Sequence, residues 1–298
     1  MKLAMLGHSG VGKTSLIAAM YGTLQSPKQG FTLSAQSKID HDLLSAFQSL
    51  KQGKYPPQSY QREVYYMRLK HNNIKVMSFD IIDYRGGILT EFETSTEQNN
   101  VLTDISTADS IILFADSYNI LYNKEIAFET NILSDLVASA LEKCRYRKAI
   151  SIVFTKTDLI DNSTFDKVRS PLEKLIGNVF HSDNAIGTIF RTSVGMKMNN
   201  VEFPILYCIC SMLIDYHNDI VRKRNELVED ANRYNSKISF TDWIDSKLAG
   251  TSTYREMRDD KLAEVRKLDK QLADLKNHFT SLRSFLVSHQ FPDFNWGK

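Results

Sequence analysis

The chain has 298 residues, with 37 basic and 35 acidic side chains and a formal net charge of +2. Its hydrophobic fraction of 42% and charged fraction of 24% are typical of a soluble globular protein with a sizeable buried core. The near-neutral charge gives no electrostatic reason to expect a nucleic-acid partner, and the length suits one large domain with an appendage or two unequal domains.

The cysteines and the apolar runs indicate the cellular compartment in which the protein is expected. Cys144, Cys208 and Cys210 are an odd number without disulfide-like spacing, which predicts a reducing, cytoplasmic environment. On a helix, Cys208 and Cys210 would project about 200° apart, which favours buried thiols over a metal pair. The apolar run Phe203–Ile214 is shorter than the ~20 residues that cross a bilayer, and Met1–Leu6 is too short for a signal peptide. We therefore expect no transmembrane segment.

Apolar runs that alternate with helix-like stretches predict an α/β fold. The expected strands are Lys2–Leu6, Glu63–Leu69, Ile74–Ile82, Ser110–Ala115, Ala149–Phe154 and Thr188–Arg191. The expected helices between them are Lys13–Tyr21, His41–Gln52, Glu125–Cys144 and Phe165–Phe180. This alternation predicts a mainly parallel sheet between two helical layers, a three-layer sandwich. The short link His71–Asn73 predicts a hairpin, and hence one antiparallel edge strand.

The last third of the chain is predicted to be helical. Phe203–Tyr234 reads as one long helix, and apolar residues recur from Val265 to Leu286 in alternating steps of four and three, the pattern of a coiled-coil seam. We expect a nucleotide-binding domain over residues 1–215 and a helical hairpin over residues 216–298, with a short helix around Trp243 at its tip. Packing of both helices along the sheet domain is the equally weighted alternative.

The first strand leads into a complete phosphate-loop motif, G-x-x-x-x-G-K-[ST]. Its residues are Gly7, His8, Ser9, Gly10, Val11, Gly12, Lys13 and Thr14, and Ser15 follows. A strand before the motif and a helix after it are what the mechanism requires, because backbone N–H groups and the helix N-terminus then face the phosphates. Lys13 is expected to bind the β- and γ-phosphates and the Thr14 hydroxyl to ligate Mg²⁺, and we count both as catalytic. The motif predicts a P-loop NTPase without choosing between ATP and GTP.

A second motif follows the strand Ile74–Ile82. Asp83 is expected to hold Mg²⁺ at this strand end, and Gly86 would let a backbone N–H approach the γ-phosphate. Asp80 is the rival for the metal, although it lies inside the strand and lacks the paired glycine. Asp-x-x-Gly is also common in ordinary turns, so this motif alone is weak.

A third motif, Thr155-Lys156-Thr157-Asp158, follows the run Ala149–Phe154. It resembles the Asn/Thr-Lys-x-Asp motif of the Ras-like, translation-factor-related GTPases. That resemblance implies GTP or GDP as ligand, with Asp158 accepting hydrogen bonds from the guanine N–H groups and Lys156 lying along the base. The alternative is a capped turn entering a helix, and then the protein could be ATP-specific. Ser193 and Val194 resemble the Ser-Ala-Lys loop of the same class, whose backbone contacts guanine.

The switch I threonine of this class has no clear match. Thr32 follows Thr14 at about the interval seen in related GTPases, so we assign it to the γ-phosphate and Mg²⁺. Thr23, Ser34 and Ser37 compete with it for this role.

Two departures from Ras-like GTPases stand out. Gly87 occupies the position of the glutamine that orients water, so hydrolysis is expected to be slow or to use Arg85, Glu91, a dimer partner or an activating protein. An insertion over residues 33–60 contains an amphipathic helix and the turn Gly53–Pro57. Together with Asp83–Gly87, it resembles the bacterial double-GTPase-like group, and the likeness spans residues 1–213.

The sequence thus predicts a GTP-dependent switch whose helical extension relays its state to a protein partner or a second copy through the switch regions or the C-terminal helices. Two alternatives remain open. Gly87 also suits a non-hydrolysing, GTP-bound scaffold, and the aromatic tip near Trp243 suits a small dynamin-like membrane protein.

Overall fold

The structure is a computed structural model, and it describes residues 1–57, 62–84, 102–142, 144, 147–181 and 185–289. Contacts divide the chain into two compact units. Unit 1 contains Met1–Met212 together with the described residues from Leu282 on, and unit 2 is Leu213–Ser281. The sequence-based division at residues 215 and 216 stays a prediction.

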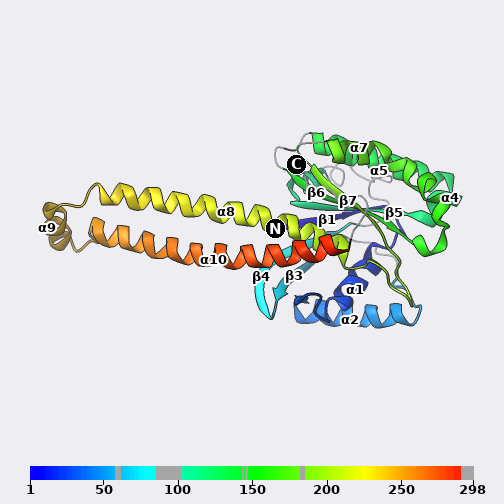
Figure 1. Ribbon diagram of the computed structural model, residues 1–298, viewed down its shortest axis with the longest axis horizontal. Helices are drawn as coiled ribbons and strands as arrows, with labels where there is room; N and C mark the ends of the chain where they lie inside the picture. Colours follow the sequence, from blue (N-terminus) through cyan, green and yellow to red (C-terminus); the bar gives the residue numbers. More distant parts are fainter. Residues whose placement is uncertain (58–61, 85–101, 143, 145–146, 182–184, 290–298) are drawn as a thin grey trace. The chain divides into compact units, whose positions relative to one another are not determined.

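Unit 1 is built on a seven-stranded sheet with strand order β2-β3-β4-β1-β5-β6-β7 (Figure 1). The strands are β1 (Lys2–Leu6), β2 (Phe31–Ala35), β3 (Glu63–His71), β4 (Ile74–Asp83), β5 (Ser110–Asp116), β6 (Lys148–Thr155) and β7 (Ala185–Arg191). Strands β4, β1, β5, β6 and β7 pair in parallel, whereas β3 runs antiparallel to both of its neighbours. The predicted α/β fold class is confirmed.

Helices cover both faces of this sheet. On one face, α5 (Lys124–Glu142) and α7 (Glu173–His181) pack against β5 and β6. Ile152, Val137 and Leu175 are among the buried residues of this hydrophobic core. On the other face, the first turns of α8 (Phe203–Asn235) receive hydrogen bonds from the sheet, because Ser151 Oγ donates to Pro204 O at 2.9 Å. Strands β5 and β6 are buried along their whole length, which explains why their sequences are continuous apolar runs.

Short elements complete unit 1. They are α1 (Lys13–Thr23), α2 (Ser37–Lys51), α4 (Ser117–Tyr122), η1 (Thr157–Leu159), η2 (Asn162–Thr164), α6 (Phe165–Arg169) and η3 (Ser170–Leu172). The single helix expected over Phe165–Phe180 is broken into α6, η3 and α7, because Pro171 lies in the 3-10 turn between the two α-helices.

The structure adds a strand and helix pairing that the sequence did not predict. Strand β2 lies outside β3, with Phe31 opposite His71 and Ala35 opposite Met67. Helix α2 packs on α1 at Gly22, where an added Cβ would lie 2.1 Å from the Phe47 ring. A glycine in the interior of α1 therefore permits the close approach of the inserted helix.

Unit 2 is a pair of long helices joined by a short one. In it the C-terminal part of α8 packs beside α10 (Tyr254–Ser288), with Leu227, Ala231, Val265 and Leu275 buried. Arg224 Nε donates to Asp269 Oδ1 at 2.6 Å across the pair. Between them, α9 (Phe240–Ala249) begins at Ser239, whose hydroxyl accepts from the Asp242 N–H, and ends at Gly250 in the left-handed conformation.

Across the described residues, we find no helix that combines the length and the apolarity needed to span a membrane.

Candidate functional site

The phosphate loop joins β1 to α1 at the carboxyl end of the parallel strands. Gly10 and Gly12 have φ of 71° and 99°, which lie in the left-handed region that glycine tolerates best. At Gly7, an added Cβ would lie 2.9 Å from Phe114 Cβ on the neighbouring strand. Helix α1 begins directly at Lys13, so the loop and the helix N-terminus form the nest of N–H groups expected for phosphates.

Lys13 is folded back onto this loop. Its Nζ donates to Gly7 O at 2.9 Å and to His8 O at 3.4 Å, and the residue is only 7% exposed. Burial lowers the pKa of Lys13, while the nearby Asp83 carboxylate opposes that shift. A buried ammonium group that donates to two carbonyls can donate to phosphate oxygens instead, because charged oxygens are stronger acceptors.

Asp83 stands beside Thr14, as the strand register requires. Strand β1 pairs Met5 with Asp83, and Thr14 Oγ1 donates to Asp83 Oδ2 at 3.1 Å. Asp83 is fully buried, and its Oδ1 has no hydrogen-bond partner. Burial raises the pKa of Asp83 to about 6, against the opposing effects of Lys13 and Thr14.

These two residues fit a magnesium ion. A buried carboxylate oxygen without a partner, next to a hydroxyl, is the hard oxygen donor set that Mg²⁺ uses together with water and substrate phosphates. The described part of the chain has no group of three or more His, Cys, Asp or Glu residues placed to hold a metal.

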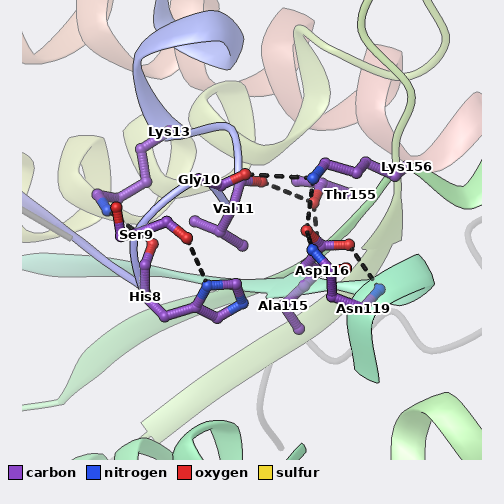
Figure 2. A network of polar contacts seen from close by, with 10 residues as sticks. All are labelled: His8, Ser9, Gly10, Val11, Lys13, Ala115, Asp116, Asn119, Thr155 and Lys156. Carbon is purple, nitrogen blue, oxygen red and sulfur yellow. Dashed lines mark hydrogen bonds and ion pairs between the residues drawn. The ribbon is translucent and has the colours of Figure 1, made fainter. Parts of the chain in front are cut away.

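The end of β6 is hydrogen-bonded to the phosphate loop (Figure 2). Thr155 Oγ1 donates to Val11 O at 2.8 Å, and Lys156 Nζ donates to Gly10 O at 3.2 Å. Lys156 itself has a φ of 54°, an uncommon left-handed conformation for a residue with a side chain. The motif at residues 155–158 and the phosphate loop are therefore parts of one site.

Asp116 is a member of this network that the sequence analysis missed. It ends β5, is fully buried, and its Oδ2 accepts from Lys156 Nζ at 2.5 Å (Figure 2). Its carboxylate also accepts from Asn119 N at 3.0 Å and from Asn119 Nδ2 at 2.8 Å, which caps α4. An aspartate directly after an apolar run, three residues before Asn119, was the available signal.

A cavity of about 590 Å³ is lined by the phosphate loop, the start of α1 and the end of β6. Its lining residues are Ser9, Gly10, Val11, Gly12, Lys13, Thr14, Ser15, Tyr55, Pro56, Pro57, Tyr118, Asn119, Thr155, Lys156, Asp158, Leu159 and Val194. Its volume lies within the range of small-molecule sites. At one end are the phosphate loop and Lys13, and Asp158 is exposed in η1 among the lining residues from the ends of β6 and β7.

Five predicted residues that the structure describes do not line the cavity: Gly7, His8, Thr32, Asp83 and Ser193. The His8 ring is buried, and its Nδ1 lies 2.7 Å from Ser9 O. Burial lowers the pKa of His8. Ser193 is buried next to Val194, and it exchanges both backbone hydrogen bonds with Asn199.

Thr32 is not brought to the site, which corrects its assignment to γ-phosphate and magnesium. It lies in β2 opposite Lys70, whereas Glu63 at the other end of β3 is the residue paired with Asp83. Lys70 is seven positions along β3 from Glu63, a distance of roughly 23 Å at 3.3 Å per residue. Arg85, Gly86, Gly87 and Glu91 lie outside the described residues.

A family model described as Double-GTPase 2 matches residues 2–185. A search of curated proteins found no match.

Solved structures give weaker likenesses. A bacterial selenocysteine-specific elongation factor, EF-Sec, matches with 22% identity and a TM-score of 0.35, over 65% of this chain. The chain spans only a quarter of that protein, 25% of its length. The small GTPase Arl6 (BBS3) of Trypanosoma brucei, with bound GppNp, matches with 14% identity and a TM-score of 0.41, over 69% of this chain and 92% of its own.

Proposed function

The chain belongs to the Double-GTPase 2 family, and from this premise we propose that it is a guanine-nucleotide switch with slow, Mg²⁺-dependent GTP hydrolysis. The observation that carries the proposal is the pair of hydrogen bonds from Thr155 and Lys156 to the carbonyls of Val11 and Gly10. These bonds hold the phosphate loop next to residues 155–158, and both segments line one cavity. A single nucleotide can therefore contact both segments.

In this proposal the two ends of the cavity bind different parts of GTP or GDP. The phosphate-loop N–H groups and Lys13 bind the phosphates, and Thr14 and Asp83 hold Mg²⁺, which neutralises the developing phosphate charge when bound. Asp158 accepts from the N–H groups on the guanine edge, which adenine does not offer, and an unpaired carboxylate would penalise the wrong base. Lys156 Nζ donates to Asp116, and in this proposal the Lys156 stem lies along the base. Ser193 and Val194 form the neighbouring loop.

Hydrolysis is proposed to be slow because Gly87 has no side chain to orient water. Arg85, which we counted as catalytic from the sequence, and Glu91 are candidates for that task, as are a partner protein and a second copy of the chain. The helical unit Leu213–Ser281 is proposed to pass the nucleotide state to such a partner, since α8 and α10 each continue from unit 1 into unit 2. A cytoplasmic location is supported by three buried, free cysteines.

The test begins with the nucleotide that copurifies with the protein, identified by chromatography after denaturation. We expect GDP or GTP, and copurifying ATP or ADP alone would contradict the guanine assignment. Multiple-turnover phosphate release with GTP and Mg²⁺ then tests the enzyme, with Lys13→Ala as the inactive control. Tight GTP retention without turnover would instead establish the scaffold alternative that Gly87 also suits.

A further inference from the structure

The turn Gly53–Pro57, which the sequence singled out without a role, forms part of the cavity wall. Gly53 has a φ of 75°, and the three residues from Tyr55 to Pro57 line the cavity. These residues belong to the insertion between β2 and β3, yet they lie next to the loop that follows β7. The connection is a hydrogen bond from Tyr55 Oη to Val194 O at 3.1 Å, between residues 139 positions apart.

The loop after β7 accommodates this tyrosine by means of a glycine. At Gly195, an added Cβ would lie 2.9 Å from Tyr55 Oη, closer than side chains pack. Tyr55 is 62% exposed, and it is one of the residues that line the cavity together with Asp158 and Lys156. The hydroxyl therefore has one specific partner while the ring borders the space proposed for the nucleoside.

The hydrogen bond constrains a single peptide plane. The carbonyl of Val194 and the N–H of Gly195 belong to the same planar unit, so holding the first fixes the direction of the second. Oriented backbone N–H groups are the donors that a loop can offer to a carbonyl oxygen on a purine. Guanine has such an oxygen, and adenine has an amino group at the same position.

We propose that Tyr55 is a positioning residue for base recognition: by holding Val194 O, it fixes the loop after β7 against the purine and ties the insertion to the base end of the cavity. This inference rests on the proposed guanine-nucleotide function. Tyr55 acts through the loop, and the phosphate end does not depend on it.

The first test is Tyr55→Phe, which removes the hydroxyl and keeps the ring. Stopped-flow release of fluorescent mant-GDP should become about three- to tenfold faster, the loss expected for one hydrogen bond. Affinity for mant-ADP should not fall, so the preference for GDP over ADP should narrow. Tyr66→Phe is the matched control, because Tyr66 is exposed on β3 and does not line the cavity. Equal losses for GDP and ADP, or no loss at all, would overturn the proposal.

A double-mutant cycle sharpens the test. Gly195→Ala should displace the hydroxyl and speed mant-GDP release in the wild-type background, but add little in the Tyr55→Phe background, where no Oη remains. Additive effects would show that the two residues act separately and would contradict the proposal. If wild-type protein binds no mant-GDP and Lys13→Ala changes nothing, the proposed function fails. If wild-type binding is tight and only the Tyr55 effects are missing, the inference alone fails.

Discussion

The two ends of the cavity differ in how the chain builds them. The phosphate end comes from one contiguous loop plus Asp83, and its charged groups Lys13 and Asp83 are buried and each takes part in hydrogen bonds. The base end is assembled from segments far apart in sequence, including residues near Tyr55, Asp116 and Val194, and Asp158 and Tyr55 are exposed there. If the proposed function holds, we expect affinity to reside mainly in the phosphate loop and Asp83, and selectivity to depend on long-range contacts that single substitutions can loosen.

The largest expected effect is at the phosphate end. Lys13→Ala removes the side-chain cation of the loop and should weaken GDP and GTP binding by about 100-fold or more, because charge-assisted contacts to phosphate are lost. Isothermal titration calorimetry measures this, and circular dichroism should show a folded protein. Lys167→Ala, an exposed lysine outside the cavity, is the control. Retained affinity in Lys13→Ala would remove the phosphate role.

An intermediate effect is expected where the two ends meet. Asp116→Asn keeps the shape of the side chain but removes the buried charge that holds Lys156, so GDP affinity should fall about tenfold. Asp166→Asn, an exposed aspartate on α6, should leave affinity unchanged. Titration of both variants with mant-GDP decides the matter, and equal affinities would mean that the Asp116–Lys156 pair has no part in binding.

The smallest expected effect is a change of stability with pH. The pKa of Asp83 is raised from 3.8 to about 6 in the folded protein, so its ionised form destabilises the metal- and nucleotide-free state at neutral pH. Protonation of the folded protein relieves this cost progressively as the pH falls from about 6 toward 3.8. At about pH 7.5, the Tm of the free wild-type protein should therefore lie a few degrees below that of Asp83→Asn. At about pH 5, this difference in Tm should be smaller.

Magnesium should invert that pH dependence. The ion needs the ionised carboxylate of Asp83. As the pH falls and this carboxylate is protonated, the affinity of the wild type for the Mg²⁺ nucleotide should decrease. Asp83→Asn has no carboxylate at this position and should not show this pH-dependent loss of affinity. Calorimetric titrations at matched pH values measure it. A Tm difference between the free proteins that does not change with pH would contradict the buried-carboxylate account.

The same contrast explains what the sequence could predict. The phosphate loop was found because its residues are contiguous, and Asp83 because it ends a predicted strand; the register of β1 and β4 places it beside Thr14. The parallel sheet followed from continuous apolar runs. These features are local in sequence, and local patterns are what single-sequence reasoning detects.

The misses are long-range. Strand β2 is short and mixes polar with apolar residues, so its pairing with β3 left no clear pattern. The interval from Thr14 to Thr32 misled because spacing along the chain does not show that Thr32 pairs with Lys70, at the end of β3 away from Asp83. In the sequence, Asp116 resembles an ordinary helix N-cap, and only the structure shows its contact with Lys156. Likewise, no sequence pattern links Tyr55 to Val194.

The central claim is that one cavity holds a nucleotide by its phosphates at one end and reads guanine through Asp158 at the other. Competition of unlabelled GTP, xanthosine triphosphate and ATP against mant-GDP, measured on wild type and Asp158→Asn side by side, tests it most directly. We predict that GTP competes best on the wild type and xanthosine triphosphate on Asp158→Asn, because the amide reverses the hydrogen-bond polarity of the carboxylate. The same order of competitors on both proteins would contradict the account.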